Sequence, residues 1–304
     1  MTAQNLIASQ ENQLGDLQAD PIKSVAGLCD HTPWKKKSAL RHAYLLAGIL
    51  LLLFRVASIF AFYGLTFVAP ESHKKKLYQL LIRSLGIRIH LNAPAEEIKK
   101  HTDGCVVATN HVSIMDTLIS LGLPNATIMI GNPISQLNFF NRILYTAALN
   151  LSQVKQWHVL ERRDLVKRIQ EWRQNQSGTT LYTTPEMTIS NQRGLFKFNS
   201  AFLSFDLPVV PLATHIDTNI GLNVNPINSS NLAIIARLLM APKIIFKLHY
   251  LDREVKLADE SKDQFAQRVQ QAVARQLRVP ATTWTAADKH AYRKELQGGG
   301  KARK

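Results

Sequence analysis

Residues 105–116, CVVATNHVSIMD, place a short β-rich run directly before the polar pair Asn110-His111, and Asp116 follows at the start of a helical pattern. A histidine held where a strand ends and a helix begins can present one ring nitrogen to a substrate, while a nearby carboxylate binds the proton on the other nitrogen. This arrangement predicts His111 as a general base and Asp116 as its orienter. The spacing by itself is a weak signal, because such a pair more often caps a helix.

Short β-rich runs and longer helical patterns alternate around this stretch. The β-rich runs lie near residue 88 and at 105–109, 126–130, 179–183, 208–214 and 243–251, and the helical patterns lie near 114–122, 135–149 and 164–175. Strands that alternate with helices are typical of an α/β layer with a largely parallel sheet. The predicted fold is therefore α/β, with a mostly parallel sheet flanked by helices.

Length, charge and cysteine content limit the kinds of fold, partner and site that the chain can have. A length of 304 residues, of which 46% are hydrophobic, is enough for one sizeable core or two modest ones. The formal charge of +15 requires an acidic partner, and nucleic acid, anionic lipid and phosphorylated substrates all qualify. Cys29 and Cys105 are isolated, which predicts a reducing compartment and no metal site. No serine lies in a Gly-x-Ser-x-Gly elbow, so direct attack by an alcohol is a simpler mechanism than an acyl-enzyme.

A long apolar stretch, AYLLAGILLLLFRVASIFAFYGLTFVA, covers residues 43–69 and has Arg55 as its only formal charge. A straight helix of this length reaches about 40 Å, which is enough to cross a hydrocarbon core of about 30 Å. The stretch therefore predicts a membrane anchor.

The basic residues beside the anchor bear on how it inserts. They lie at 35–37 and 41 before the stretch and at 74–76, 83 and 88 after it, so a positive-inside count shows almost no difference between its ends. This symmetry favours a hairpin with both ends on the cytosolic side, and the alternatives are a single span and a buried helix of a soluble domain. Arg55 argues against the hairpin, since a guanidinium deep in the membrane costs about 2.5–3.5 kcal/mol. Residues 74–85 fit a helix on the membrane surface or one that covers a core.

Four segments follow from these patterns. They are a polar flexible arm over 1–38, the hydrophobic anchor over 39–70, an α/β domain over 71–256, and a C-terminal helix with a basic tail over 257–304. Ser261 and Gln264 form a capping-box pattern at the start of that helix, apolar residues recur at four-residue spacing as far as Leu277, and Pro280 ends the helix.

Further segments strengthen the interpretation of His111 and Asp116. Residues 110–116, NHVSIMD, resemble the Asn-His-x-x-x-x-Asp motif of the PlsC-type glycerolipid acyltransferases. Residues 184–190, TPEMTIS, resemble that family's Phe-Pro-Glu-Gly-Thr-Arg-Ser motif, and 207–212, LPVVPL, resemble its later Val-Pro-Val-x-Pro-Val strand. Residues 160–164, LERRD, resemble its Ile-Asp-Arg segment. The resemblance implies a PlsC-like core in which His111 and Asp116 are catalytic, with acyl-CoA as co-substrate and no cofactor.

The second motif departs from the family at two positions. In the family its glycine allows close backbone approach and its arginine is thought to hold the substrate phosphate; these positions are Met187 and Ile189 here. Glu186 is kept, and in the family it helps to shape the site. The candidates to bind phosphate instead are basic residues of neighbouring segments, each equally well explained as a solvated surface residue: Arg162, Arg163, Arg193 and Lys197.

Within this superfamily, the run NQRGLFKFNS at 191–200 and the C-terminal segments DQFAQRVQQAVARQL and TWTAADKHAYRK are most similar to the ancient ubiquitous protein 1 group, with the lysophosphatidylcholine acyltransferases next. That resemblance implies a monotopic protein of the endoplasmic reticulum membrane and the lipid droplet surface, with its core facing the cytosol. Members of the group also carry a ubiquitin-binding CUE domain and a helix that recruits a ubiquitin-conjugating enzyme, and neither occurs within these 304 residues. Ubiquitin-pathway partners therefore rest on the resemblance only.

Two functions from different classes follow. The first is transfer of an acyl chain from acyl-CoA to a hydroxyl of a lysophospholipid or related glycerolipid, among membrane lipids. The second is a scaffold with weak turnover that acts in lipid droplet or protein quality-control functions, which Met187 and Ile189 favour. A nucleic-acid partner is not expected, because the basic residues cluster around the anchor, where anionic lipid explains them, and no recognition motif is present.

Overall fold

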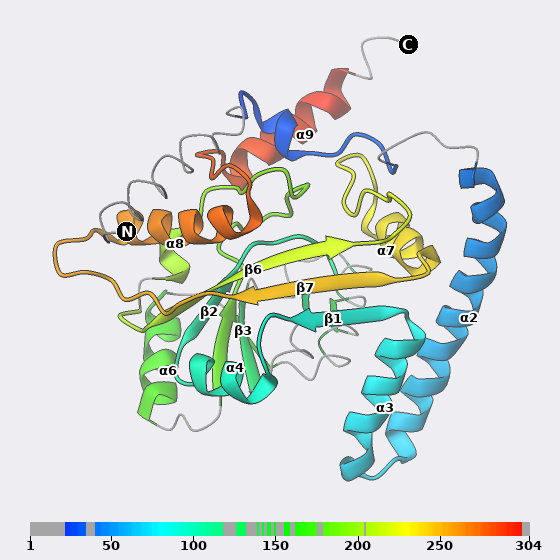
Figure 1. Ribbon diagram of the computed structural model, residues 1–304, viewed down its shortest axis with the longest axis horizontal. Coiled ribbons are helices and arrows are strands. Elements are labelled where there is room, and N and C mark those ends of the chain that lie inside the picture. The colour runs from blue at the N-terminus through cyan, green and yellow to red at the C-terminus, as the bar shows by residue number, and fades with distance from the viewer. Residues whose placement is uncertain are drawn as a thin grey trace, which may run out of the picture.

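A seven-stranded sheet forms the centre of the molecule (Figure 1). The structure, a computed structural model, describes residues 22–34, 40–117, 126–131, 155–158, 162–174, 179–203 and 205–299, and the single positions 139, 142, 145, 146 and 149. The strand order is β1-β7-β6-β2-β5-β3-β4, and every neighbouring pair is parallel except β6 with β7. The strands are β1 (Ile87–Leu91), β2 (Val106–Thr109), β3 (Ala126–Gly131), β4 (Lys155–His158), β5 (Thr179–Thr183), β6 (Val209–Asp217) and β7 (Ile244–Tyr250). The predicted α/β fold with a mostly parallel sheet is confirmed.

The strands lie where the β-rich runs predicted them, with one exception. The exception is β4, which was not predicted and consists of the four residues Lys155, Gln156, Trp157 and His158. A strand this short and polar carries no apolar alternation, and its pairing with β3 makes it visible only in the folded chain. The helices predicted near 114–122 and 135–149 fall largely outside the described residues; residues 114–117 form a turn and the beginning of a 3-10 turn.

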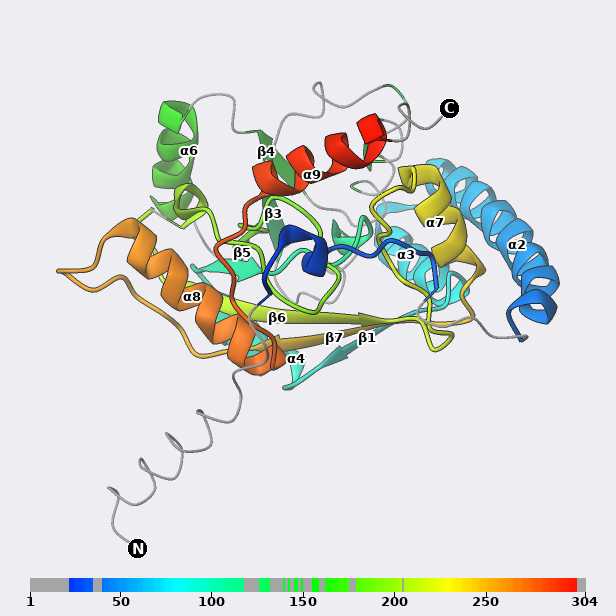
Figure 2. The ribbon, with the colours of Figure 1, turned by 90° about the horizontal axis from the view of Figure 1, so that it is seen from above.

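Helices cover both faces of the sheet. On one face, alternate strand residues such as Val107 and Phe246 share a core with α3 (Glu71–Ser84), α4 (Ala95–Thr102), α7 (Asn231–Met240) and part of α2 (Leu40–Val68). On the other face, Val106 and Val209 pack with α6 (Arg162–Gln174) and α8 (Lys262–Leu277). Figure 2 shows α6 and α8 at one end of the molecule and α2, α3 and α7 at the opposite end. All four residues of β2 are buried, as expected for a central parallel strand that is covered on both faces.

The C-terminal part of the chain contains two helices. The capping box of Ser261 and Gln264 is present at the start of α8, and Arg278 ends that helix in the left-handed conformation with φ 56°. This prediction is confirmed. The second helix, α9 (Ala286–Gly299), was not predicted, and it packs near the short 3-10 helix η1 (Val25–Leu28).

The anchor segment forms one unbroken helix, α2, of 29 residues. The hairpin that the flanking charges favoured would need a bend inside 39–70, and this prediction is wrong. The stretch holds no proline before Pro70, so nothing interrupts the helical hydrogen bonds until the chain reverses into α3. Among the described residues, one helix is long and apolar enough to cross a membrane, over Tyr44–Leu65.

Arg55 is not exposed to lipid in this structure, because it is buried between helices with 2% of its surface exposed. Its guanidinium donates hydrogen bonds to the carbonyls of Leu239 and Ala241 at the end of α7, to Pro242 and, at 3.3 Å, to Ser84 at the end of α3. These are carbonyls that have no partner within their own helices, and a cation at a helix C-terminus also complements the helix dipole. The membrane cost expected for Arg55 therefore does not arise in this packing.

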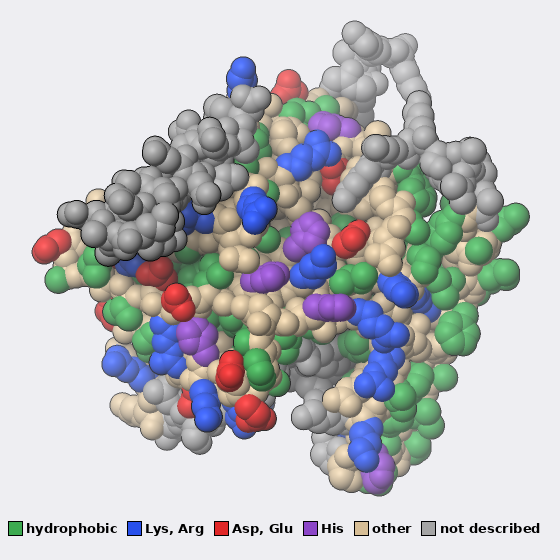
Figure 3. Space-filling model, viewed as in Figure 1, with side chains coloured by type: hydrophobic (Ala, Val, Ile, Leu, Met, Phe, Trp, Pro, Cys, Tyr) green, Lys and Arg blue, Asp and Glu red, His purple; other side chains and the backbone are tan. Residues whose placement is uncertain are grey.

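The opposite side of α2 is apolar and exposed. It presents large side chains that contact no other part of the described chain closely enough to be buried: Leu46, Ile49, Leu50, Leu53, Phe54, Phe60, Tyr63, Leu65 and Val68. Figure 3 shows hydrophobic side chains gathered over α2, with a row of basic side chains beside them. We call these nine residues the α2 apolar face.

Residues 22–34 lie against the domain, so the prediction of a flexible arm over 1–38 is wrong for this part. Val25 and Leu28 are buried against Phe196, with Trp284 packed beside them. The Leu28 carbonyl accepts a hydrogen bond from the Asn191 N–H at 3.1 Å. Burial of these apolar side chains offsets the entropy cost of ordering a segment that looked polar as a whole. Residues 1–21 and 35–38 lie outside the described part of the chain.

Candidate active site

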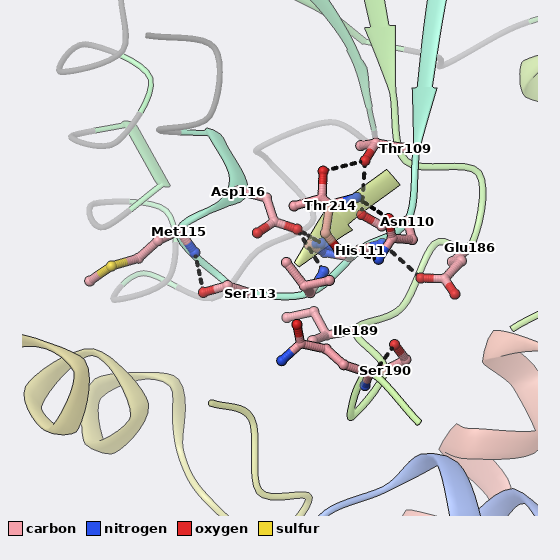
Figure 4. Close-up of polar contacts among 12 residues, drawn as sticks. Thr109, Asn110, His111, Ser113, Met115, Asp116, Glu186, Ile189, Ser190 and Thr214 are labelled. Carbon is pink, nitrogen blue, oxygen red and sulfur yellow. Dashed lines mark hydrogen bonds and ion pairs between the residues drawn. The ribbon is translucent and has the colours of Figure 1, made fainter. Parts of the chain in front are cut away.

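The C-terminal end of β2 is locked to β6 immediately before His111 (Figure 4). The side-chain amide of Asn110 donates to the Thr214 carbonyl and accepts from the Thr214 N–H, both at 2.8 Å. The hydroxyls of Thr109 and Thr214 are also 2.8 Å apart. The amide therefore continues the β2–β6 pairing one step beyond Thr109 and Leu212, and it fixes the backbone from which His111 projects.

His111 and Asp116 form a hydrogen-bonded dyad. The Nδ1 atom of His111 lies 2.8 Å from Oδ2 of Asp116, and the imidazole keeps 24% of its surface exposed. Because the carboxylate accepts only from a protonated Nδ1, we infer that the neutral ring carries its proton there. The lone pair of Nε2 is then free to take a proton from a bound molecule, which is the function of a general base.

The turn between the two residues holds the carboxylate in place. Oδ2 of Asp116 also accepts the Val112 N–H at 2.8 Å, and the Asp116 N–H donates to the Ser113 carbonyl at 3.1 Å. Asp116 is 2% exposed, and its second oxygen, Oδ1, is buried without a hydrogen-bond partner among the described residues. A buried acceptor that is held by two donors on one oxygen has little freedom, so the imidazole is oriented by a rigid group.

Glu186 lies beneath this turn and binds two backbone segments together. One carboxylate oxygen accepts the His111 N–H at 2.7 Å and the other accepts the Phe196 N–H at 2.8 Å, while only 1% of the residue is exposed. Burial raises the pKa of Glu186 to about 8, and the two backbone donors and the ammonium of Lys289 act in the opposite direction. With one backbone N–H bonded to each oxygen, Glu186 links the backbone of His111 to that of Phe196, and its predicted place among the substrate-binding residues stays a prediction.

The loop around Glu186 keeps a backbone conformation that favours glycine, although it holds none. Met187 has φ 54°, in the left-handed region, and its N–H closes a turn on the Thr184 carbonyl at 3.0 Å. Further along, the Ser190 N–H donates to the His111 carbonyl at 3.0 Å. The loop is therefore bonded to both the N–H and the carbonyl of His111, so its position sets that of the imidazole.

Of the predicted phosphate-binding residues, the structure describes the side chains of Arg193 and Lys197, and among the described residues neither bonds to His111 or Asp116. Arg193 is exposed and pairs with the buried carboxylate of Asp30 at 3.1 Å. Lys197 is exposed, and its backbone N–H bonds to Trp284. Arg162 and Arg163 form the first turn of α6, and their side chains lie outside the described part of the structure. Their role in binding phosphate stays a prediction.

Three residues that bond to the backbone around this site were not predicted from the sequence: Asn110, Thr214 and Lys289. In the sequence, Asn110 is the first residue of the motif Asn-His-x-x-x-x-Asp, and no motif marks Thr214 or Lys289. An amide directly after a buried strand is a signal that could have been used, because such a side chain often pairs with backbone. Nothing local could have indicated Lys289, which lies 100 residues from the Ile189 carbonyl that it contacts.

Within the described ranges, no three His, Cys, Asp or Glu side chains come together as a possible metal site.

Comparisons with known proteins agree with the motifs. Residues 88–215, which include His111, Asp116 and Glu186, match the family model described as acyltransferase. The crystal structure of the 1-acyl-sn-glycerophosphate acyltransferase PlsC from Thermotoga maritima superposes with a TM-score of 0.50 and 15% identity, over 78% of this chain and 97% of that chain. Comparison with curated proteins found no match. Residues 88–215 therefore match the acyltransferase family model, and the chain shares the α/β fold of that PlsC structure, whereas similarity to the ancient ubiquitous protein 1 group stays a prediction.

Proposed function

We propose that the protein transfers an acyl chain from acyl-CoA to a free hydroxyl of a lysophospholipid or related glycerolipid. The observation that carries this proposal is the His111–Asp116 dyad at the end of β2, with Nδ1 bonded to the carboxylate at 2.8 Å and the ring part exposed. The acyltransferase family match over 88–215 supports the reaction class. The nature of the donor and acceptor rests on the sequence motifs.

The proposed reaction is a direct transfer. Nε2 of His111 takes the proton of the acceptor hydroxyl as its oxygen attacks the thioester carbonyl of acyl-CoA, forming a C–O bond and a tetrahedral intermediate. The C–S bond then breaks, and the coenzyme A thiolate leaves with the proton from His111. Asp116 holds the ring in the required tautomer and stabilises the imidazolium that forms between the two steps.

Binding of the acceptor phosphate is assigned to Arg162, Arg163, Arg193 and Lys197. Arg193 is the best placed of the described candidates, because Asn191 and Gln192 connect it directly to Ser190, which bonds to His111. Its pairing with Asp30 holds the guanidinium in one place, while the side chain keeps 66% of its surface exposed. A fixed and exposed guanidinium is suited to binding a phosphate oxygen.

The enzyme proposal is tested with purified protein in detergent micelles, labelled acyl-CoA and a panel of lysophospholipids. Wild-type protein is expected to incorporate label into at least one acceptor, and His111→Ala to lose about 100-fold or more of that rate. His290→Ala, at an exposed position of α9, is the matched control and should behave as wild type. Equal incorporation by wild type and His111→Ala would refute the assignment of His111.

Met187 and Ile189 favour a second function, a scaffold on a lipid surface with weak turnover. Both replace residues that the family uses at the acceptor, and Ile189 offers an apolar side chain where phosphate would need a cation. Ubiquitin-pathway partners belong to this alternative and rest on resemblance alone. Absence of label from every acceptor, together with intact folding, would favour the scaffold.

Membrane attachment through the α2 apolar face is the third part of the proposal, at the endoplasmic reticulum and lipid droplets with the core in the cytosol. Because Arg55 and its neighbours face α7 and α3, the exposed side of α2 is free to lie in a lipid surface, and a full span would require α2 to leave these contacts. A helix with one apolar side is typical of interfacial binding.

Two experiments test this attachment. Leu50→Asp, in the α2 apolar face, should lower vesicle binding by about 100-fold in a flotation assay, since an aspartate in apolar lipid costs several kcal/mol. Val255→Asp, at an exposed apolar position outside α2, is the control and should leave binding unchanged. Glycosylation in microsomes at the acceptor sites Asn125, Asn150, Asn175 or Asn228 would contradict the cytosolic orientation.

A further inference from the structure

Lys289, in the first turns of α9, reaches the candidate active site from the C-terminal part of the chain. Its ammonium donates to the carbonyl of Ile189 and lies 5.8 Å from the centre of the Phe196 ring. Burial is the main influence on this lysine and lowers its pKa, whereas Cys29, Glu186 and Asp30 act to raise it. Lys289 is thus a part-buried cation between the loop that carries Glu186 and the N-terminal segment.

Two sets of contacts direct Lys289 to this place. The hydroxyl and N–H of Thr285 both donate to Asp288 at 2.7 Å, which fixes the first turn of α9. The preceding segment is bonded along residues 195–197: the Leu195 N–H donates to Pro280 at 3.0 Å, and the Lys197 N–H donates to Trp284 at 2.7 Å. Because the helix start and its approach are both fixed, the ammonium position is set by the fold and not by chance rotation of a surface side chain.

The structure assigns Lys289 as a positioning residue of the candidate active site: its ammonium holds the 186–190 loop against the backbone of His111 through the Ile189 carbonyl. The inference rests on the proposed role of His111. Among the described residues, Lys289 is the cation whose charge acts on Glu186.

The effect passes from Lys289 to the imidazole through a short series of bonds. The ammonium anchors Ile189, whose neighbour Ser190 binds the His111 carbonyl at 3.0 Å. Glu186, within the same loop, binds the His111 N–H at 2.7 Å. Loss of the ammonium removes one hydrogen bond to the loop and the positive charge that acts on the buried Glu186 carboxylate. The hydrogen bonds that Glu186 accepts from the His111 N–H and that Ser190 donates to the His111 carbonyl should both weaken.

The test compares four variants. Lys289→Met removes the donor and the charge at similar length, Lys289→Gln keeps a donor without the charge, and Lys289→Arg keeps both. Lys294→Met, at an exposed position of the same helix, is the matched control. The first readout is hydrogen exchange of the His111 N–H, which should be about tenfold faster in Lys289→Met and unchanged in Lys294→Met. Unchanged exchange in a folded Lys289→Met protein would overturn the inference.

The second readout is an NMR titration of the Glu186 carboxyl carbon, with its signal identified by Glu186→Gln. The midpoint near pH 8 should move upward in Lys289→Met and Lys289→Gln, because a positive charge that favours the ionised form has been lost. It should stay in place in Lys289→Arg and Lys294→Met. If Lys289→Met does not fold, Lys289→Gln decides, and a midpoint equal to that of wild type would overturn the inference.

Both readouts are independent of turnover. If the Lys289 variants show the exchange and titration effects but wild-type protein transfers no acyl chain, the proposed function is refuted and the positioning by Lys289 stands. An active wild type whose Lys289 variants match Lys294→Met in both readouts would refute the role of Lys289 alone.

Discussion

Replacement of Asn110 by alanine tests whether the β2–β6 amide clamp positions the base. The substitution leaves the N–H and the carbonyl of Thr214 without their partner, and Thr214 is fully buried. An unsatisfied buried backbone group costs about 1–3 kcal/mol, so the two together should lower the free energy of unfolding by about 2–4 kcal/mol after partial relaxation. His111 then projects from a strand end that is no longer fixed. Acyl transfer should fall by about 100-fold, because displacing a catalytic group by about 1 Å has an effect of that size.

The chain offers a matched control for this substitution. Asn92 makes the same pair of bonds, to the N–H and carbonyl of Tyr250 at 3.0 Å each, at the end of β1. Asn92 is more exposed, so Asn92→Ala should cost about 1–2 kcal/mol of stability, and it should leave acyl transfer unchanged. Urea unfolding gives the first quantity and the labelled acyl-CoA assay gives the second. Equal activity of Asn110→Ala and Asn92→Ala, both folded at the assay temperature, would refute the positioning argument.

Three other substitutions probe the dyad and the loop beneath it. Asp116→Asn should lower the rate of acyl transfer by about 100- to 10,000-fold, because it removes the charge that supports the imidazolium and allows the wrong tautomer, whereas Asp252→Asn, with the same change at an exposed position, should not. In wild type, the pKa of Glu186 is raised from 4.5 to about 8 in the folded state, so its protonated form stabilises the fold. This contribution to the free energy of unfolding is fully present below pH 4.5 and is lost as the pH rises to about 8, at about 1.4 kcal/mol per pH unit. Unfolding measured from pH 5 to 8.5 should lack this slope in Glu186→Gln, and an identical slope in both proteins would contradict the raised pKa. Met187→Gly should stabilise the fold by about 0.5–1 kcal/mol, because glycine removes the strain of the left-handed backbone but adds entropy to the unfolded chain. Thermal unfolding measures this change. A loss of stability would mean that the Met187 side chain stabilises the fold by more than its backbone strain costs.

The features that depend on local sequence were predicted well. β2, β5, β6 and β7 contain apolar or β-branched residues in short runs, and the helix α8 begins at a capping box and ends before Pro280, so neighbouring residues suffice to specify them. The proximity of His111 and Asp116 belongs here too, since five residues that form one tight turn bring the two side chains together.

The features that depend on distant contacts were not predicted, or were predicted wrongly. Flanking charges suggested that α2 bends, although no proline interrupts it, and the side of α2 that packs on the domain is decided by Arg55, which binds the ends of α7 and α3. The composition of residues 22–34 suggested a free arm, but Val25 and Leu28 are buried against Phe196. In both cases the partner lies more than 25 residues away, and no local pattern encodes it.

The sequence by itself determined the α/β layer, the apolar helix and a histidine with its carboxylate at the end of a central strand. The tertiary structure decided what holds that histidine: Asn110 on Thr214, Glu186 on two backbone N–H groups, and Lys289 on the loop that contains Glu186. The physical reason is that a reactive pair can be made by one turn of chain, whereas its rigidity comes from hydrogen bonds and buried charge between segments that meet only when the sheet and the C-terminal helices have packed.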